Sequence, residues 1–94
     1  PMSREARREI GFLLRELQDG VRLAMPQSRP MPVIGARCHE LRVNDVNKTW
    51  RVVYRLDTDA IVILEVFEKK TSQTPPAMIA ACRQRLQRYE EAQP

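Results

Sequence analysis

The feature that most constrains this chain is a run of three strand-like stretches that follow one another with only short turns between them. They cover approximately residues 37–43, 50–57 and 60–69 and are rich in β-branched and aromatic residues. The cluster from Asn44 to Asn47 predicts the first turn, and Asp57-Thr58-Asp59 is short enough for a tight hairpin. The pattern therefore predicts an antiparallel meander.

A helical pattern precedes the strands. Apolar residues recur at three- and four-residue steps over residues 6–17, with Ser3 placed as N-cap and Gly20 placed to end the helix. Residues 21–36 lose this periodicity and contain three prolines, so we expect a loop without a regular element. The third strand-like stretch is nearly all apolar over residues 61–66, which favours a strand that is covered on both faces or central in the sheet.

A second helical pattern follows the strands. Thr74 followed by Pro75 predicts an N-cap with proline at the first helical position, and an apolar stripe continues to about Glu91. With 94 residues the chain has the length of one domain, residues 1–94, so we expect a single α+β unit.

The charge balance favours an anionic partner. Sixteen Lys and Arg against twelve Asp and Glu give a net charge of +4, which suits nucleic acid or an acidic protein. Cys38 and Cys82 have no metal-ligand spacing and make no disulfide framework, which is typical of a reducing compartment. No apolar stretch approaches the ~20 residues of a membrane-spanning helix. We therefore expect a soluble cytoplasmic protein without metal, cofactor or membrane partner.

Strand alternation predicts which side chains share a face of the sheet. Trp50, Val52, Tyr54 and Leu56 form the natural core face in the second strand. The opposite, open face should then carry four charged residues, which are Glu40, Arg42, Arg51 and Arg55. Lys69 or Lys70, at the end of the third strand, can reach the same side. The pattern predicts a concave basic surface with one carboxylate.

Such a surface has a chemical use in RNA cleavage without a metal. That reaction needs a base for the 2′-hydroxyl proton and cations for the charge that develops on the phosphate. Arg and Lys supply the cations. Glu40 is the only carboxylate expected on this face, and its attraction to neighbouring arginines would weaken it as a base.

Simpler interpretations compete with the chemical one. Basic residues on an exposed strand face are ordinary solubility devices, and Glu68-Lys69-Lys70 is a common guard against edge pairing. His39 could serve as a base, but it alternates onto the core side. Trp50 and Tyr54 could stack on RNA bases, but their alternation is more typical of a core. Arg83, Arg85 and Arg88 on the last helix form a solvated face or a contact for an acidic partner segment.

Four short motifs in order resemble the phage-derived, HigB-like branch of the RelE/ParE toxin superfamily. They are Glu40-Leu41-Arg42, the stretch from Trp50 to Arg55, the stretch from Phe67 to Thr71, and Thr74-Pro75. The resemblance runs from about Arg4 to Tyr89. It implies a RelE-like fold with an N-terminal helix or helical hairpin, a three- to four-stranded antiparallel sheet and a C-terminal helix.

The resemblance also implies a function. Toxins of this kind commonly cleave mRNA on the ribosome as part of a type II toxin–antitoxin system, held in check by a cognate antitoxin that is often a helix-turn-helix protein. By position, Arg51 and Lys70, with Lys69 beside it, would stabilise the scissile phosphate, and Glu40 completes the candidate catalytic set. The candidate RNA-binding residues are Arg42, Arg55 and Lys48.

The chain departs from the family pattern at three places. Glu40 stands where RelE-type toxins place a lysine, and Pro76 lies near the position of a C-terminal tyrosine used by some relatives. The strand that usually precedes the first helix has no counterpart, so we expect an unpaired sheet edge. Two alternatives to the nuclease follow: a ParE-like toxin that binds gyrase, and an inactive member that only binds its antitoxin.

Overall fold

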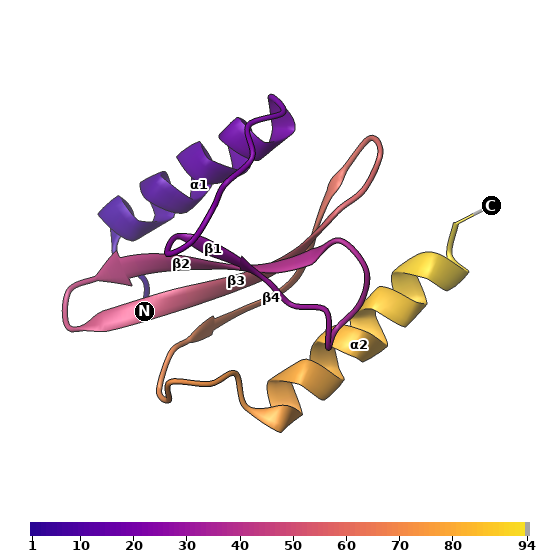
Figure 1. Cartoon of the computed structure of the whole chain (residues 1–94). Helices are drawn as coiled ribbons and strands as arrows, with labels where there is room; N and C mark the ends of the chain where they lie inside the picture. Colours follow the sequence, from indigo (N-terminus) through magenta and orange to yellow (C-terminus); the bar gives the residue numbers. More distant parts are fainter. Residues whose placement is uncertain (94) are drawn as a thin grey trace.

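The computed structural model describes residues 1–93 and contains one helix on each side of a sheet. In chain order the elements are α1 (Arg4–Gln18), β1 (Ser28–Pro30), β2 (Cys38–Asp45), β3 (Lys48–Leu56), β4 (Ile61–Glu68) and α2 (Pro76–Glu91). Figure 1 shows α1 above the sheet and α2 below it. The predicted α+β class, with an N-terminal helix, an antiparallel sheet and a C-terminal helix, is confirmed.

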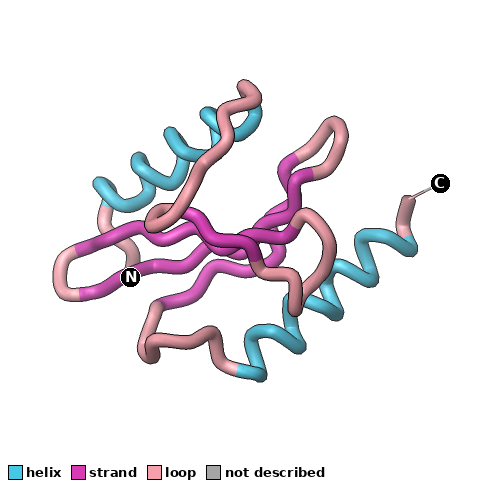
Figure 2. The backbone as a smooth tube through the Cα atoms, in the orientation of Figure 1, coloured by secondary structure: helices cyan, strands magenta, loops and turns pink. Residues whose placement is uncertain are grey.

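The sheet is a simple meander. Its four strands lie in the order β1-β2-β3-β4, and all neighbouring pairs are antiparallel. Figure 2 traces the two hairpins that join β2 to β3 and β3 to β4. The turn of the β2–β3 hairpin consists of Val46 and Asn47. Asn47 adopts a φ of 59°, a conformation that asparagine tolerates better than most residues. The predicted turns are therefore in the right places.

The expectation that residues 21–36 hold no regular element is wrong. Ser28, Arg29 and Pro30 form β1, which pairs with β2 through Leu41, Glu40 and His39. β1 is an outer strand, so Pro30 can end it without the loss of a ladder hydrogen bond. The segment between Gly20 and β1 forms no second helix among residues 1–93, so the single-helix alternative holds.

α1 begins and ends where the sequence predicts. The Ser3 hydroxyl accepts a hydrogen bond from the Ala6 amide at 3.0 Å, and Gly20, with a φ of 89°, follows the last turn. Its apolar stripe packs on the predicted core face of the sheet. The buried residues of this core are Ala6, Leu13, Leu17, Leu41, Val43, Val52 and Tyr54. His39 also lies on this face, where its ring stacks on Tyr54 at 5.4 Å between centroids.

The other face of the sheet is covered too. α2 and the segment 31–36 bury a second apolar cluster there, made of Met31, Ile34, Cys38, Val53, Leu64, Cys82 and Leu86. A Cβ on Gly35 would lie 2.8 Å from the Leu86 side chain, so this segment and α2 approach closely. Both cysteines are free, and burial raises the pKa of Cys82 to about 11, which leaves its thiol unreactive. The predicted open face does not exist over this part of the sheet.

β4 is an edge strand, neither central nor covered on both faces as its composition indicated. Val62, Leu64 and Phe67 pack in the cluster with α2, whereas Ile63 and Val66 remain 42% and 41% exposed on the side of α1. None of the helices within residues 1–93 is long and apolar enough to cross a bilayer.

Candidate functional site

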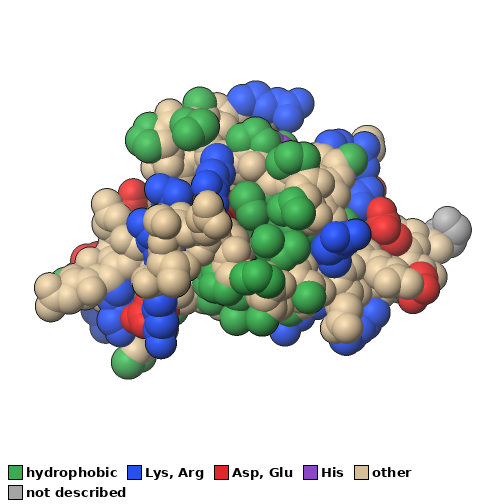
Figure 3. All heavy atoms as spheres, turned by 60° about the horizontal axis from the view of Figure 1, so that its bottom comes forward, with side chains coloured by type: hydrophobic (Ala, Val, Ile, Leu, Met, Phe, Trp, Pro, Cys, Tyr) green, Lys and Arg blue, Asp and Glu red, His purple; other side chains and the backbone are tan. Residues whose placement is uncertain are grey.

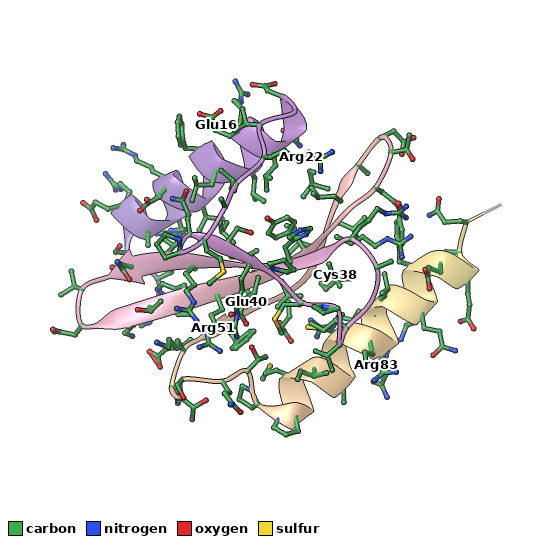
Figure 4. All side chains as sticks on the ribbon, in the orientation of Figure 1. Glu16, Arg22, Cys38, Glu40, Arg51 and Arg83 are labelled. Carbon is green, nitrogen blue, oxygen red and sulfur yellow. The ribbon has the colours of Figure 1, made fainter. Side chains whose placement is uncertain are left out.

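Two charged groups that the sequence places on an open face lie in the interior. Arg51 and Glu40 are each 0% exposed. Figure 4 shows them beside one another on the side of the sheet that faces α2. The Thr74 hydroxyl connects them, because it donates to Glu40 Oε2 at 2.5 Å and accepts from Arg51 Nη1 at 3.2 Å. With Arg29 these residues form what we call the buried cluster.

Arg51 holds the segment between β4 and α2. Its Nη2 donates to the carbonyl oxygens of Thr71 and Ser72, at 3.0 and 3.1 Å. Burial lowers the pKa of Arg51 from its usual value, and the negative charge of Glu40 opposes that shift. Arginine stays protonated in proteins, so Arg51 is a buried cation that is compensated by one carboxylate and two backbone carbonyls.

Arg29 brings β1 into the same cluster. The Nε atoms of Arg29 and Arg51 lie 3.3 and 3.5 Å from Glu40 Oε1. Neither contact has hydrogen-bond geometry, so both are ion pairs by proximity alone. Arg29 Nη2 also donates to the Thr74 hydroxyl at 3.4 Å. One carboxylate thus serves two arginines, which gives Glu40 a structural reason to stand where the family resemblance implies a lysine.

The expectation that Arg51 and Glu40 line an uncovered basic face is therefore wrong. α2 and the segment 71–74 cover them, and in this conformation neither side chain can touch an RNA phosphate. Thr74 is also not the N-cap of α2, which begins after Pro75 without a side-chain cap. The reason is that the Thr74 hydroxyl is engaged by the buried cluster.

Arg55 belongs to a different part of the molecule. Its Nη1 donates to Glu90 Oε2 at 2.6 Å, and its Nη2 lies 3.5 Å from Asp57 Oδ1. Asp57 also accepts from the Tyr89 hydroxyl at 2.7 Å, so these contacts tie the end of α2 to the end of β3. The hydrogen bond from Tyr89, followed by the charges of Arg55 and Arg37, lowers the pKa of Asp57. The structure does not bring Arg55 together with the candidate lysines.

Lys48, Lys69 and Lys70 do come together. They surround an open depression of about 620 Å³ between the β2–β3 turn and the segment that follows β4. We call it the lysine depression, and its complete lining is Asn44, Asp45, Asn47, Lys48, Thr49, Lys69, Lys70, Thr71 and Ser72. The Lys70 side chain is 78% exposed, and the Lys48 side chain is 32% exposed. Arg42 is half-buried and pairs with Arg51 on the neighbouring strand, so the two side chains lie on the same face of the sheet.

The lysines have only partial compensation. Glu68 carboxylate oxygens lie 3.3 Å from Lys48 Nζ and 3.9 Å from Lys70 Nζ. Lys48 Nζ also lies 5.7 Å from the Trp50 ring centroid. Figure 3 shows that Lys and Arg side chains are spread over the face that it displays, in several groups with Asp and Glu among them. The lysine depression is thus a local basic site on a surface of mixed charge.

Asp45 fixes one wall of the depression. Its Oδ2 accepts from the Ser3 amide and from Trp50 Nε1, each at 2.9 Å, and its Oδ1 accepts from the Val46 amide at 2.7 Å. These bonds, those from Ser3 first, hold the pKa of Asp45 well below its usual value. A carboxylate in this state is a poor base. The other base candidate, His39, is on the α1 side and its Nδ1 lies 3.2 Å from the Arg37 carbonyl oxygen. The depression offers cations for a phosphate and no evident base.

Sequence reasoning missed Arg29 and Thr74 as members of the cluster. Arg29 lies in a proline-rich segment that carries no strand pattern, and Thr74 has the spacing of a helix cap. One signal was available: Glu40 is the lone carboxylate among arginines on its strand face, and a lone carboxylate among cations favours a structural ion pair.

Comparisons with known proteins give one match. Neither the curated proteins nor the solved structures contain a match to this chain. A family model, described as phage-derived protein Gp49-like (DUF891), matches residues 1–87. The matched residues include all four strands, the buried cluster and the lysine depression. The chain therefore belongs to the Gp49-like family of phage-derived proteins.

Proposed function

We propose that this protein is the toxin of a type II toxin–antitoxin pair, of the HigB-like branch, and that it engages mRNA on the ribosome through the lysine depression. Family membership supports the general assignment. The observation that carries the specific one is the meeting of Lys48, Lys69 and Lys70 around a single open depression. The proposed partners are the message and a cognate helix-turn-helix antitoxin.

The chemistry of the depression suits an RNA backbone. Each ammonium group is a strong point charge for a phosphate oxygen, and the hydroxyl and amide groups of the lining can bond sugar and phosphate. If the message is cut, the lysines supply the electrostatic part of a metal-independent attack by the 2′-hydroxyl. In this proposal Arg51 is a positioning residue, since it holds the backbone directly after Lys70.

The burial of Arg51 and Glu40 favours a second candidate, a toxin without nuclease chemistry. Two residues of the candidate catalytic set, Arg51 and Glu40, are enclosed by protein. A ParE-like gyrase-binding toxin, or a member that only binds its antitoxin, requires neither of them at the surface.

Expression of the chain without its neighbouring antitoxin, together with message cleavage in a translating extract, tests the proposal. The key variant replaces both Lys69 and Lys70 by alanine. A matched control replaces Arg83 and Arg88 by alanine, because it removes the same charge from exposed positions on α2. We expect growth arrest and cleaved message, with 2′,3′-cyclic phosphate ends, from the wild type and the control. The lysine variant should lose message-cleaving activity by at least about a hundredfold, the scale of one lost electrostatic group.

Each other outcome contradicts a named part of the proposal. Equal activity of the lysine variant and the control would contradict the assignment of the site. Growth arrest with intact message and an induced DNA-damage response would support the gyrase-binding alternative. Absence of growth arrest would support a member that only binds its antitoxin.

A further inference from the structure

The outer edge of β4 is open to a further strand, and its hydrogen-bonding pattern can be read from one contact. The Lys69 amide donates to the Thr49 carbonyl at 2.7 Å, so this pair is hydrogen-bonded. Bonded and non-bonded pairs alternate along an antiparallel ladder, which makes Arg51/Phe67 bonded and Val52/Val66 non-bonded. The Val66 amide and carbonyl therefore point away from β3, toward the open edge.

Two side chains occupy this edge at its centre. Glu65 Oε1 accepts from the Val66 amide at 3.0 Å. Arg85, from α2, donates to the Leu64 carbonyl at 2.8 Å and lies 2.9 Å from Glu65 Oε2. The register shifts at Val53/Tyr54, so Leu64 is the extra residue of a β-bulge. We call Glu65 and Arg85 the edge clamp. Glu65 accepts from the outward Val66 amide and Arg85 donates to the Leu64 carbonyl, so two backbone groups that an added strand would need are already bonded.

We propose that the β4 edge is a masked strand-pairing surface and that the edge clamp prevents a second copy of this chain from pairing with it. An unprotected edge strand of eight residues with apolar side chains is a ready template for a further strand. β4 has such side chains, because Ile63 and Val66 are about two-fifths exposed beside the open edge. The clamp and the bulge are protein devices that blunt such edges.

Charge complementarity identifies the second copy as the strand that fits. The Asp57 amide donates to the Ala60 carbonyl, so the backbone groups of Ile63, like those of Val66, point away from β3. Two β4 strands that pair antiparallel about the Leu64–Glu65 peptide bond match these outward groups, and this register places Asp59 of each copy opposite Lys70 of the other. Opposite charges at facing positions stabilise a strand pair. The exposed Ile63 then faces the exposed Val66 of the other copy, on the same side of the sheet. The same register leaves Lys69 opposite the uncharged Ala60.

The test uses the full chain with Arg85→Ala, and Arg83→Ala as the control on the same helix. Molar mass is measured by light scattering after size-exclusion chromatography over a range of protein concentrations. We expect a concentration-dependent dimer for Arg85→Ala only. Adding Lys70→Glu to Arg85→Ala sets like charges face to face and should restore the monomer, whereas adding Lys69→Glu should not.

A second measurement covers the case in which Arg85→Ala does not fold. Hydrogen exchange of the Val66 amide is measured in the wild type and in Glu65→Ala, and removal of the acceptor should speed exchange by about tenfold or more. Three results would overturn the proposal: a folded Arg85→Ala with the mass of the control, unchanged exchange in Glu65→Ala, or a wild type that dimerises through β4 with the clamp in place. None of these depends on toxin activity.

Discussion

The buried cluster and the lysine depression contain the same kind of charge in opposite surroundings. Both use the segment after β4, because Thr71 and Ser72 accept from Arg51 and also line the depression. Arg51 has no exposed surface, whereas the Lys70 side chain is 78% exposed. The difference is that segment 71–74 covers Arg51, which becomes a structural group, whereas Lys70 remains exposed and accessible to a ligand.

The energetic consequence differs accordingly. Removal of one partner of a buried ion pair lowers the unfolding free energy by about 3–5 kcal/mol, because the remaining charge is desolvated and uncompensated. An exposed ion pair such as Lys70 with Glu68 contributes little. Substitutions in the buried cluster should therefore lower stability, whereas substitutions of the lysines in the lysine depression should not, and this difference can be measured.

The largest effect is expected for Arg51→Met. This change leaves Glu40 with the partly exposed Arg29 as its remaining counterion and the carbonyls of Thr71 and Ser72 without their donor. We expect a loss of about 3–5 kcal/mol of unfolding free energy in chemical denaturation. The control, Lys70→Met, should change it by less than about 0.5 kcal/mol. Equal stability of the two variants would show that Arg51 is not a structural group.

A smaller loss is expected for Thr74→Val. Valine keeps the shape but removes the hydroxyl that joins Glu40 to Arg51. An unmade buried hydrogen bond costs about 1–3 kcal/mol, and we expect a loss in that range in the same assay. Thr58→Val, at an exposed position in the β3–β4 hairpin, is the control. A neutral Thr74→Val would mean that the cluster does not depend on its central hydroxyl.

The smallest effect concerns pH and the wall of the lysine depression. Hydrogen bonds from Ser3 and Trp50 depress the pKa of Asp45 in the folded state. Its contribution to stability is therefore present above the unfolded pKa of about 3.9 and is lost as the pH falls below that value. Melting temperatures measured over this range should fall less steeply with acid in Asp45→Asn than in the wild type. Asp57, whose pKa is also lowered, remains in both proteins and preserves a common background. Parallel curves would contradict the role assigned to Asp45.

Local pattern was enough for much of the fold. Ser3 and Gly20 bound α1 as expected, and the aromatic and aliphatic side chains of β3 lie on the α1 face as alternation predicted. β1 was missed because three residues with a proline carry no period, and its pairing with β2 is a long-range contact. For the site, the sequence named Lys48, Lys69 and Lys70 as candidates, and the structure places them around one depression. The burial of Arg51 and Glu40 could not be predicted from the sequence.

The sequence by itself determined the two helices, the strands β2 to β4 with their turns, the α1 core and the basic character of the chain, because these depend on residues close together along the chain. Only the tertiary structure decided which cations remain accessible. Strand alternation states that Arg51 lies opposite the α1 core, but not whether another element covers that side. α2 covers the part of that side around Val53 and Leu64, because its own apolar stripe must be buried. The segment 71–74, which leads into α2, encloses Arg51, and Glu40 and Thr74 compensate its charge.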